Sequence, residues 1–467
     1  MCDCDDSSSE KIAFAGIAYV IHPTLHTPNS ELFLRESVFL MASFKDMSKQ
    51  ELEAVREQLQ AEYDGYKAEN LKLNMARGIP GKEQLELSMG LLDSVNSSTD
   101  LTGINGADYR NYGILDGIPE AKQLFADLFD VTTDQIIVGG NSSLTLMFDT
   151  ISSAMAHGLL GSTPWASLPE VKFLCPVPGY DRHFGITEYF GIKMITVEMN
   201  QDGPDMDYIE KVVAGDPYVK GVWCVPKYSN PTGITYSDEV VRRFANLKPA
   251  AQDFRIFWDN AYCIHHLFND DVKLLDILKE CEKAGNPNMV YMYFSTSKIT
   301  FPGAGLAGMA SSKENITAIK KRMTVQSIGP DKINQLRHMK FFNNLDGLLE
   351  QMKKHADIIR PKFEAVDRTL TERFGDSGVA VWSKPNGGYF VSLNVLEGCA
   401  KKTVRLCREA GVTLTNAGAT YPYGDDPKDS NIRIAPTSPS VEELTEAMKV
   451  LACSAKLAAA EKMLASM

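Results

Sequence analysis

The sequence lacks a hydrophobic run long enough to cross a membrane. Its longest early apolar run, IAFAGIAYVI at 12–21, has ten residues, whereas a membrane-spanning helix needs about 20. The segment before it, MCDCDDSSSE, is acidic, and a secretory signal begins with positive charge instead. We therefore expect a cytoplasmic protein without membrane contact.

An excess of positive charge is also missing. The chain has 48 Lys and Arg against 60 Asp and Glu, which gives a net charge of −12. A nucleic-acid-binding protein needs a basic face to neutralise phosphates. The charge balance therefore argues against nucleic acid as a partner, although it allows a local basic pocket for a small anion.

Metal-ligand spacing is absent too. The nine cysteines form no CxxC pair, which a structural zinc site would require. Cys2 and Cys4 have no second ligand pair after them, and His265 and His266 have no carboxylate or cysteine at a suitable spacing. We predict no metal site and free thiols in a reducing compartment.

The chain of 467 residues is long enough for two domains. Apolar segments alternate with helical ones after residue 105, and most are continuously apolar, which is typical of strands covered on both faces. We predict an α/β fold in which a mostly parallel sheet has helices on both faces, together with a smaller α+β domain. The expected strands are 135–140, 171–177, 192–199, 221–226, 254–259 and 290–295, and the clearest helices between them are 237–247 and 272–285.

The expected domain limits follow from changes in pattern along the chain. Residues 1–46 show no sustained periodicity and are predicted to be a disordered extension. A helix is expected after Ser48, which forms a capping-box pattern with Glu51. We assign 91–344 to the large domain, and 47–90 with 345–467 to the small one.

Polar residues follow the predicted strands at the places where those strands end. In open α/β sheets, ligands bind beyond the carboxyl ends of the strands. Each of these residues also has an ordinary structural explanation, as a helix cap, a turn residue or a packing residue. Together they are informative, because five strand ends contribute them in order: Asn141, Ser142 and Ser143; Tyr180; Asn230; Asp259 and Tyr262; Ser295 and Lys298.

This set matches the chemical needs of pyridoxal 5′-phosphate. The aldehyde of that cofactor forms a Schiff base with a lysine, its ring nitrogen needs an acidic partner, and its phosphate suits a helix N-terminus. We expect Lys298 to bind the aldehyde and Asp259 to face the ring nitrogen. The other residues would bind the phenolic oxygen (Asn230 and Tyr262), stack on the ring (Tyr180) and hold the phosphate (Asn141, Ser142, Ser143 and Ser295).

The same stretches resemble the class I aminotransferases, which are fold-type I pyridoxal-phosphate enzymes. SIGPDK at 327–332 narrows the resemblance to the aspartate aminotransferases of subgroup Ic. The resemblance implies a homodimer with shared active sites, in which Tyr112 reaches the phosphate of the partner subunit and Arg433 binds the substrate α-carboxylate. The stretches that carry it are MARGIP, NYGILDGIPEAKQLF, GGNSSL, PGYDRHF, SNPTG, DNAY, STSK, PNGGYF and NIRIAP.

The expected reaction moves an amino group from an amino acid, expected to be aspartate, to a 2-oxo acid, expected to be 2-oxoglutarate, by a ping-pong mechanism. Lys298 would remove the α-proton and return it, for which its amine must be neutral, and burial lowers a lysine pKa. A β-lyase or decarboxylase on the same cofactor site stays an alternative. A pyridoxal-phosphate-binding regulator would need a DNA-binding domain, which the first 46 residues are too short and too acidic to supply.

One departure from many class I relatives concerns the expected phosphate contact. Leu306 stands eight residues after Lys298, where those relatives have an arginine on the phosphate. Arg77 is our candidate to replace that charge, and backbone N–H groups are the alternative. An acidic substrate also needs a second cation for its side chain, and Arg77, Arg322 and Lys332 are candidates that could equally form surface or interface ion pairs.

Overall fold

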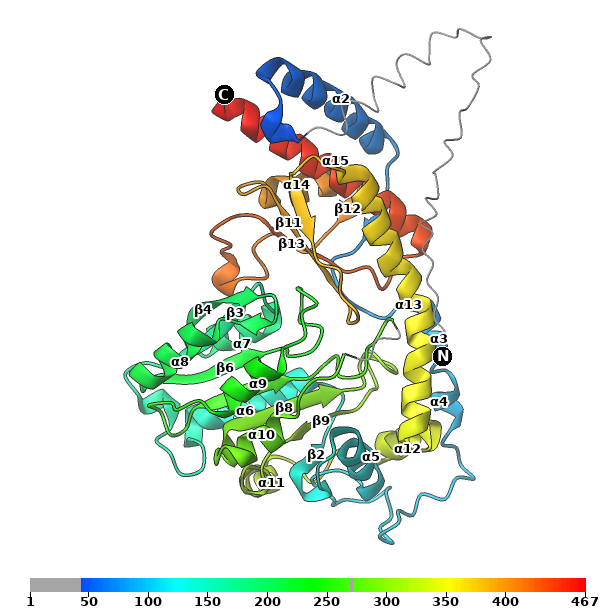
Figure 1. Ribbon diagram of the computed structural model, residues 1–467. Helices are drawn as coiled ribbons and strands as arrows, with labels where there is room; N and C mark the ends of the chain where they lie inside the picture. The colour runs from blue at the N-terminus through cyan, green and yellow to red at the C-terminus, as the bar shows by residue number, and fades with distance from the viewer. Residues whose placement is uncertain (1–42, 269–271) are drawn as a thin grey trace, which may run out of the picture.

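The computed structural model describes residues 43–268 and 272–467. Its largest feature is an eight-stranded sheet in the order β2-β9-β8-β7-β6-β3-β4-β5 (Figure 1). The five strands from β8 to β4 in this order are parallel, whereas β2, β9 and β5 pair antiparallel. The bounds are β2 Ile136–Val138, β3 Lys172–Val177, β4 Lys193–Asn200, β5 Gly203–Pro204, β6 Val219–Cys224, β7 Arg255–Asp259, β8 Val290–Ser295 and β9 Ala307–Ala310.

The sheet is buried on both faces, as its continuously apolar strands predict. Successive side chains of a strand point to opposite faces, so in β6 Val222 and Cys224 pack on one face and Trp223 on the other. The first face is covered by α5 Pro119–Phe129, α8 Met206–Gly215, α9 Asp238–Ala245 and α10 Ile277–Lys283, and the second by α6 Ser143–His157, α7 Asp181–Tyr189 and α11 Lys313–Gln326. The predicted α/β architecture is confirmed.

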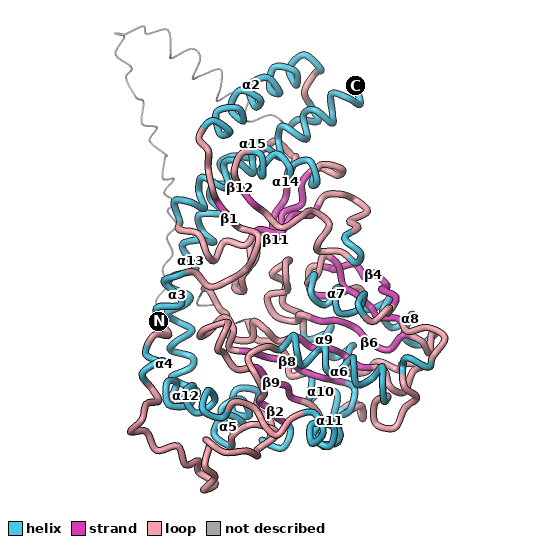
Figure 2. Tube along the Cα trace, turned by 180° about the vertical axis from the view of Figure 1, so that it is seen from behind, coloured by secondary structure: helices cyan, strands magenta, loops and turns pink. Residues whose placement is uncertain are grey.

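The rest of the chain is built around a separate cluster of buried side chains, and this part contains two small sheets. Figure 1 shows α13 running from α12 next to the large sheet towards α15, and Figure 2 shows the same arrangement from behind. The helices are α2 Lys49–Ala68, α3 Lys82–Glu86, α4 Gly90–Asp93, α12 Lys332–Phe342, α13 Leu345–Phe374, α14 Ala400–Glu409 and α15 Val441–Ser466. The strands are β1 Leu73–Asn74 with β12 Val412–Thr413, and β10 Ala380–Trp382 with β11 Val391–Val395 and β13 Asn431–Ile434.

The helix α13 packs against both parts of the molecule. Leu348 and Met352 in its first half share a cluster with α12, whereas Phe363 and Leu370 in its second half pack with α15. No single residue of this helix therefore divides the chain, and the limits 47–90, 91–344 and 345–467 stay a prediction.

The N-terminal boundary needs a correction. Residues 44–46, which we assigned to a disordered extension, form the 3₁₀-helix η1 Phe44–Asp46. The Phe44 side chain is buried, and its N–H donates to the carbonyl of Ser377. An aromatic side chain gains enough from burial to anchor such a short segment. Ser43 is the N-cap of this helix, and the rest of the expected extension, 1–42, lies outside the described residues.

The smaller expectations differ in their outcomes. The capping box of Ser48 and Glu51 is confirmed at the start of α2. The helix expected over 272–285 begins later, at Ile277, because Asp276 caps it. The strand β9 was not predicted. The cysteines that the structure describes have free thiols, as predicted. Within 43–268 and 272–467, no helix combines the length and the apolar character that crossing a bilayer requires.

Candidate active site

A cavity of about 210 Å³ lies at the carboxyl ends of the parallel strands. It collects residues from β7, β8, the start of α6, the residue before α7 and the loop after β6, because the carboxyl ends of parallel strands meet at one edge of the sheet. Most of the predicted site residues line it. They are Ser142, Ser143, Tyr180, Asn230, Asp259, Tyr262, Ser295 and Lys298, together with Leu144, Met147, Val225, Ala261 and Ser297.

Lys298 reaches this cavity from the turn that follows β8. Thr296 fastens the turn, since its N–H donates to the carbonyl of Leu306 at 2.7 Å and its Oγ1 accepts from the Leu306 N–H at 2.8 Å. The ammonium nitrogen lies 5.0 Å from the ring centre of Tyr262 and 5.8 Å from that of Tyr389. Burial lowers the pKa of Lys298, and the charge of Asp259 opposes this shift only in part. Lys298 therefore loses its proton more readily than a solvent-exposed lysine, in the direction that a base needs.

Asp259 ends β7 and is almost fully buried. Its Oδ2 lies 3.0 Å from Nε2 of His183, whose ring is stacked on Trp223 with 4.3 Å between the ring centres. Its Oδ1 is buried and has no hydrogen-bond partner in the described part of the chain. One carboxylate oxygen is therefore left for a donor in the cavity, and a protonated ring nitrogen of pyridoxal phosphate meets that need.

His183 is a residue that the sequence interpretation missed. It lies within the quoted stretch PGYDRHF, three residues after Tyr180, and one helical turn brings such residues to the same side. That spacing was the available signal, because a carboxylate at the end of a buried strand is costly to bury unless it is paired.

A hydroxyl group, that of Tyr262, and an amide group, that of Asn230, suit the phenolic oxygen that pyridoxal phosphate would bring. Burial raises the pKa of Tyr262 well above its usual value, so this residue keeps its proton and can donate it. Asn230 is buried beside it, and its Oδ1 accepts a 3.4 Å hydrogen bond from Nη1 of Arg433. Burial also raises the pKa of Tyr180 to about 12, so this residue contributes a neutral aromatic ring to the cavity.

The end of the cavity that we expect to face the phosphate offers hydroxyls and a helix N-terminus. Ser142 is the N-cap of α6, but its side chain makes no capping hydrogen bond, which leaves the N–H groups of the first turn open to an anion. Ser297, which we did not predict, also lines the cavity. Asn141 does not line it, because its side-chain amide donates to the carbonyls of Pro302 and Gly303 at 3.3 and 3.2 Å.

The cation expected near the phosphate is not found where relatives have it. Leu306 is buried in the core, and Arg77 has an exposed side chain outside the cavity lining. Among the described residues that line the cavity, Lys298 is the only basic one. The helix dipole and the hydroxyls are therefore the groups of this chain that meet a phosphate charge.

Arg433 lies on β13, next to the cavity through its contact with Asn230. Its Nη1 donates to Oδ1 of Asp181 at 2.7 Å, and its Nη2 donates to Oγ1 of Thr415 at 3.4 Å. The guanidinium also lies 5.1 Å from the ring centre of Phe390. Arg433 on β13 is thus joined to Asp181 on α7. Asp181 is a third residue, after His183 and Ser297, that the sequence interpretation missed.

The remaining predicted residues lie outside the cavity of this chain. Tyr112 is 81% exposed. Lys332 is buried, and its ammonium donates to the carbonyl of Gly113 at 3.1 Å, so it supports the loop that carries Tyr112. Arg322 donates to the carbonyl of Asp149 at 3.1 Å. These contacts give Lys332 and Arg322 structural roles within the chain.

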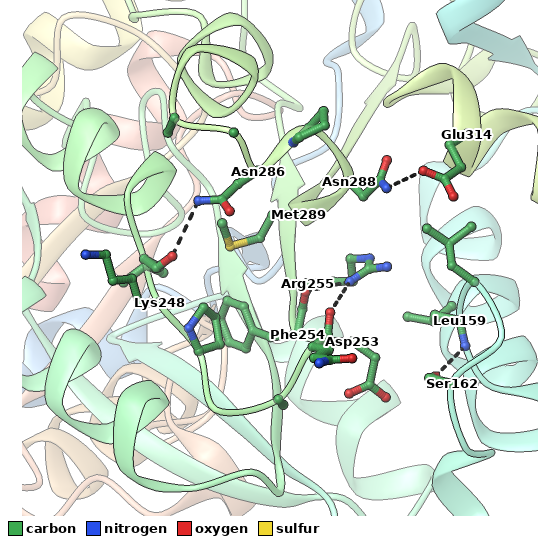
Figure 3. Close-up of a pocket in the computed structure, with 18 of the residues that line it drawn as sticks. Leu159, Ser162, Lys248, Asp253, Phe254, Arg255, Asn286, Asn288, Met289 and Glu314 are labelled. Carbon is green, nitrogen blue, oxygen red and sulfur yellow. Dashed lines mark hydrogen bonds between the residues drawn. The ribbon is translucent and has the colours of Figure 1, made fainter.

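A larger cavity of about 710 Å³ lies at the opposite, amino ends of the strands (Figure 3). It is lined by Asp253, Arg255 and Glu314, among others, and by none of the predicted site residues. Asp253 is already paired, with Nζ of Lys220 at 2.6 Å and Nε1 of Trp165 at 2.7 Å. The larger size of this cavity does not make it the active site. Lys298, the unpaired carboxylate oxygen of Asp259 and the open N-terminus of α6 all lie at the opposite edge of the sheet.

Comparison with known proteins identifies the family of this chain. The family model for aspartate aminotransferases matches residues 47–466. The chain belongs to the aspartate aminotransferase family. The match extends from just before α2 to the end of α15, so it includes every strand end described above.

Related proteins match over nearly their whole length. A protein of Mycolicibacterium smegmatis is 48% identical over 90% of this chain and 99% of its own. An aspartate aminotransferase of Corynebacterium glutamicum is 44% identical over 91% of this chain and 99% of its own. The crystal structure of an aspartate transaminase from C. glutamicum superposes with a TM-score of 0.88, at 44% identity, over 90% of this chain and 99% of that one.

Proposed function

We propose that this aminotransferase uses pyridoxal 5′-phosphate to move an amino group from aspartate to 2-oxoglutarate. The observation that carries the proposal is that Lys298, whose neutral form is favoured by burial, shares one cavity with the unpaired Oδ1 of Asp259. A base beside a buried acidic partner for a ring nitrogen is the arrangement that this cofactor requires.

When bound, the cofactor supplies an electron sink for the electrons of the substrate's α-carbon–hydrogen bond. Asp259 would hold the proton on the ring nitrogen, and His183 keeps the carboxylate oriented at 3.0 Å. Lys298 would take the α-proton and give it back as general base and acid. Tyr262 and Asn230 would donate to the phenolic oxygen, and Tyr180 would cover the ring.

The hydroxyls of Ser142, Ser143 and Ser295, with the first turn of α6, would hold the phosphate. Arg433 would bind the substrate α-carboxylate beside Asn230, which orients the α-carbon towards Lys298. The 44% identity to a relative named aspartate aminotransferase supports aspartate as the donor. Arg77 stays our candidate for the side-chain carboxylate, because Lys332 and Arg322 are engaged by the carbonyls of Gly113 and Asp149.

The test is an absorbance titration of the holoenzyme with single amino acids. Aspartate should convert the visible band of the lysine-linked cofactor to a near-ultraviolet band, and 2-oxoglutarate should restore it. Alanine at the same concentration is the matched control for the acidic side chain. If alanine converts the band and aspartate does not, the proposed donor is wrong. If aspartate gives carbon dioxide or another cleavage product without a restorable band, the decarboxylase or β-lyase alternative replaces the aminotransferase.

We also propose a cytoplasmic homodimer in which Tyr112 completes the partner's site. The exposure of this tyrosine and the buried support of its loop by Lys332 favour a role outside the chain's own cavity. Tyr112→Ala and Lys298→Ala should each be nearly inactive, whereas a mixed dimer regains one intact site. Mixed dimers without activity would contradict the shared site, and a fully active monomer would do the same.

A further inference from the structure

Arg433, the residue proposed to bind the substrate α-carboxylate, already holds a carboxylate of its own chain. Oδ1 of Asp181 lies 2.7 Å from Nη1, which is the distance of a charge-assisted hydrogen bond. The Arg433 side chain is only 7% exposed, whereas that of Asp181 is 32% exposed. A buried cation and a half-buried anion thus form the pair at the edge of the active site.

The geometry of the guanidinium leaves little room for a second carboxylate. Its Nε is buried and makes no hydrogen bond within the described residues, so this side is closed to a ligand. Its Nη2 has only the long 3.4 Å contact with Thr415. A carboxylate that binds in bidentate fashion must therefore use the Nη1–Nη2 edge, and Asp181 occupies Nη1 of that edge.

Asp181 can leave this position without a rearrangement of the backbone. It is the first residue of α7, its side chain reaches solvent, and the positive end of the helix dipole stabilises its charge in either orientation. A rotation about the bonds of this short side chain replaces the ion pair by water. Arg433 has no such freedom, because Asn230, Thr415 and the ring of Phe390 surround it.

We propose that Asp181 is an internal competitor of the substrate α-carboxylate. It pairs with Arg433 while the site is empty, and the substrate displaces it on binding. This inference rests on the proposed function of Arg433. The apparent affinity for a carboxylate is then reduced by the fraction of molecules in which Arg433 is available. Product release gains from the same competition, since Asp181 takes the arginine back.

The proposal makes a directional prediction about the variants Asp181→Asn and Asp181→Ala. Both should bind carboxylates more tightly than the wild type, with Kd lower by roughly fivefold to fiftyfold. Asp238→Asn is the matched control, because Asp238 also begins a helix and pairs with an arginine, Arg242, at 3.2 Å, but on an exposed face outside the cavity. Its Kd should equal that of the wild type.

The measurement is calorimetric titration of each holoenzyme with succinate, an unreactive dicarboxylate, followed by the aspartate absorbance titration. Thermal melts check folding, and the asparagine variant, which keeps the shape and a hydrogen-bond acceptor, carries the test if the alanine variant unfolds. An equal or higher Kd for succinate in Asp181→Asn overturns the proposal and makes Asp181 a positioning residue for Arg433. Failure of succinate to bind any of these proteins overturns it as well.

The two proposals fail in different ways. If the wild type binds succinate but no amino acid converts its absorbance band, the proposed function is wrong, while the succinate series still decides the role of Asp181. If aspartate converts the band and the succinate Kd is unchanged by Asp181→Asn, only the competitor is wrong. Pyridoxal-phosphate affinity should be equal in all four proteins, because Asp181 does not line the cofactor cavity.

Discussion

The Nε2 atom of His183 lies 3.0 Å from Oδ2 of Asp259, and the imidazole is stacked on the indole of Trp223 with an angle of 8° between the rings. Both members of the hydrogen-bonded pair are buried. The stacking fixes the imidazole, and the imidazole fixes the carboxylate, so that Oδ1 is left as the oxygen without a partner among the described residues. The core of the large sheet therefore sets the direction of the proposed cofactor contact.

The first prediction concerns this pair. His183→Leu removes the hydrogen bond and leaves a second buried oxygen of Asp259 without a donor, at a cost of about 1–3 kcal/mol. We expect kcat to fall by roughly tenfold to a hundredfold and the affinity for pyridoxal phosphate to decrease. His183→Gln, which retains a donor, should recover part of both values. Steady-state kinetics and cofactor titration measure them, and equal values for the leucine variant and the wild type would rule out a role for His183.

The second prediction concerns Lys298. Lys298→Ala should lose the visible band of the lysine-linked cofactor, and its activity should fall by about 10³-fold or more, because the residue is both the covalent attachment point and the base. Lys313→Ala is the control, since Lys313 is an exposed lysine on α11 that pairs with Asp134. The absorbance spectrum and the aminotransferase activity of both variants test this prediction. A visible band that persists in Lys298→Ala would mean that another amine binds the aldehyde.

The third prediction concerns Arg433. Arg433→Lys keeps the positive charge but loses the bidentate hydrogen-bonding geometry that suits a carboxylate. We expect KM for aspartate to rise by about tenfold to a hundredfold, with a smaller change in kcat. Arg242→Lys on the exposed side of α9 should leave both constants unchanged. If KM for aspartate is the same in Arg433→Lys and the wild type, the α-carboxylate binds elsewhere.

The fourth prediction concerns stability and pH. Lys456 lies in the middle of α15, where burial lowers its pKa to about 8, and its ammonium donates to the carbonyl of Arg373 at 3.1 Å. The pKa of an unfolded lysine is about 10.4. Below pH 8 both states are protonated and the full cost of burying the charge applies. Between pH 8 and 10.4 the folded state loses its proton first, so this lysine makes stability rise with pH.

Lys456→Met removes this dependence. The variant should be more stable relative to the wild type at pH 7.5 than at pH 10.4, and the difference should shrink by about 2–3 kcal/mol across that range. Urea unfolding at fixed protein concentration and several pH values measures it. Lys462→Met, at an exposed position of the same helix, should show no such trend. A constant difference for Lys456→Met would mean that the folded lysine keeps an ordinary pKa.

Six of the eight strands of the large sheet and most of the cavity lining could be predicted from the sequence alone. The continuous apolar run that forms β7 indicated a strand covered on both faces, and the residue after its only tryptophan, Asp259, indicated a functional carboxylate. The same reasoning held for Lys298 after β8 and for Tyr180 after β3. These predictions rest on local patterns, because strand ends are read from the chain itself and parallel strands bring their carboxyl ends to one edge.

Other features depended on contacts between distant segments. The pairing of Asp181 with Arg433 joins α7 to β13, and that of His183 with Asp259 joins α7 to β7. Lys332 was proposed from its position as a substrate cation, yet it holds the carbonyl of Gly113. The single sequence determined which residue types stand at the strand ends. Only the tertiary structure decided which charges meet, because a side chain pairs with whatever the packing of remote elements brings within hydrogen-bonding distance.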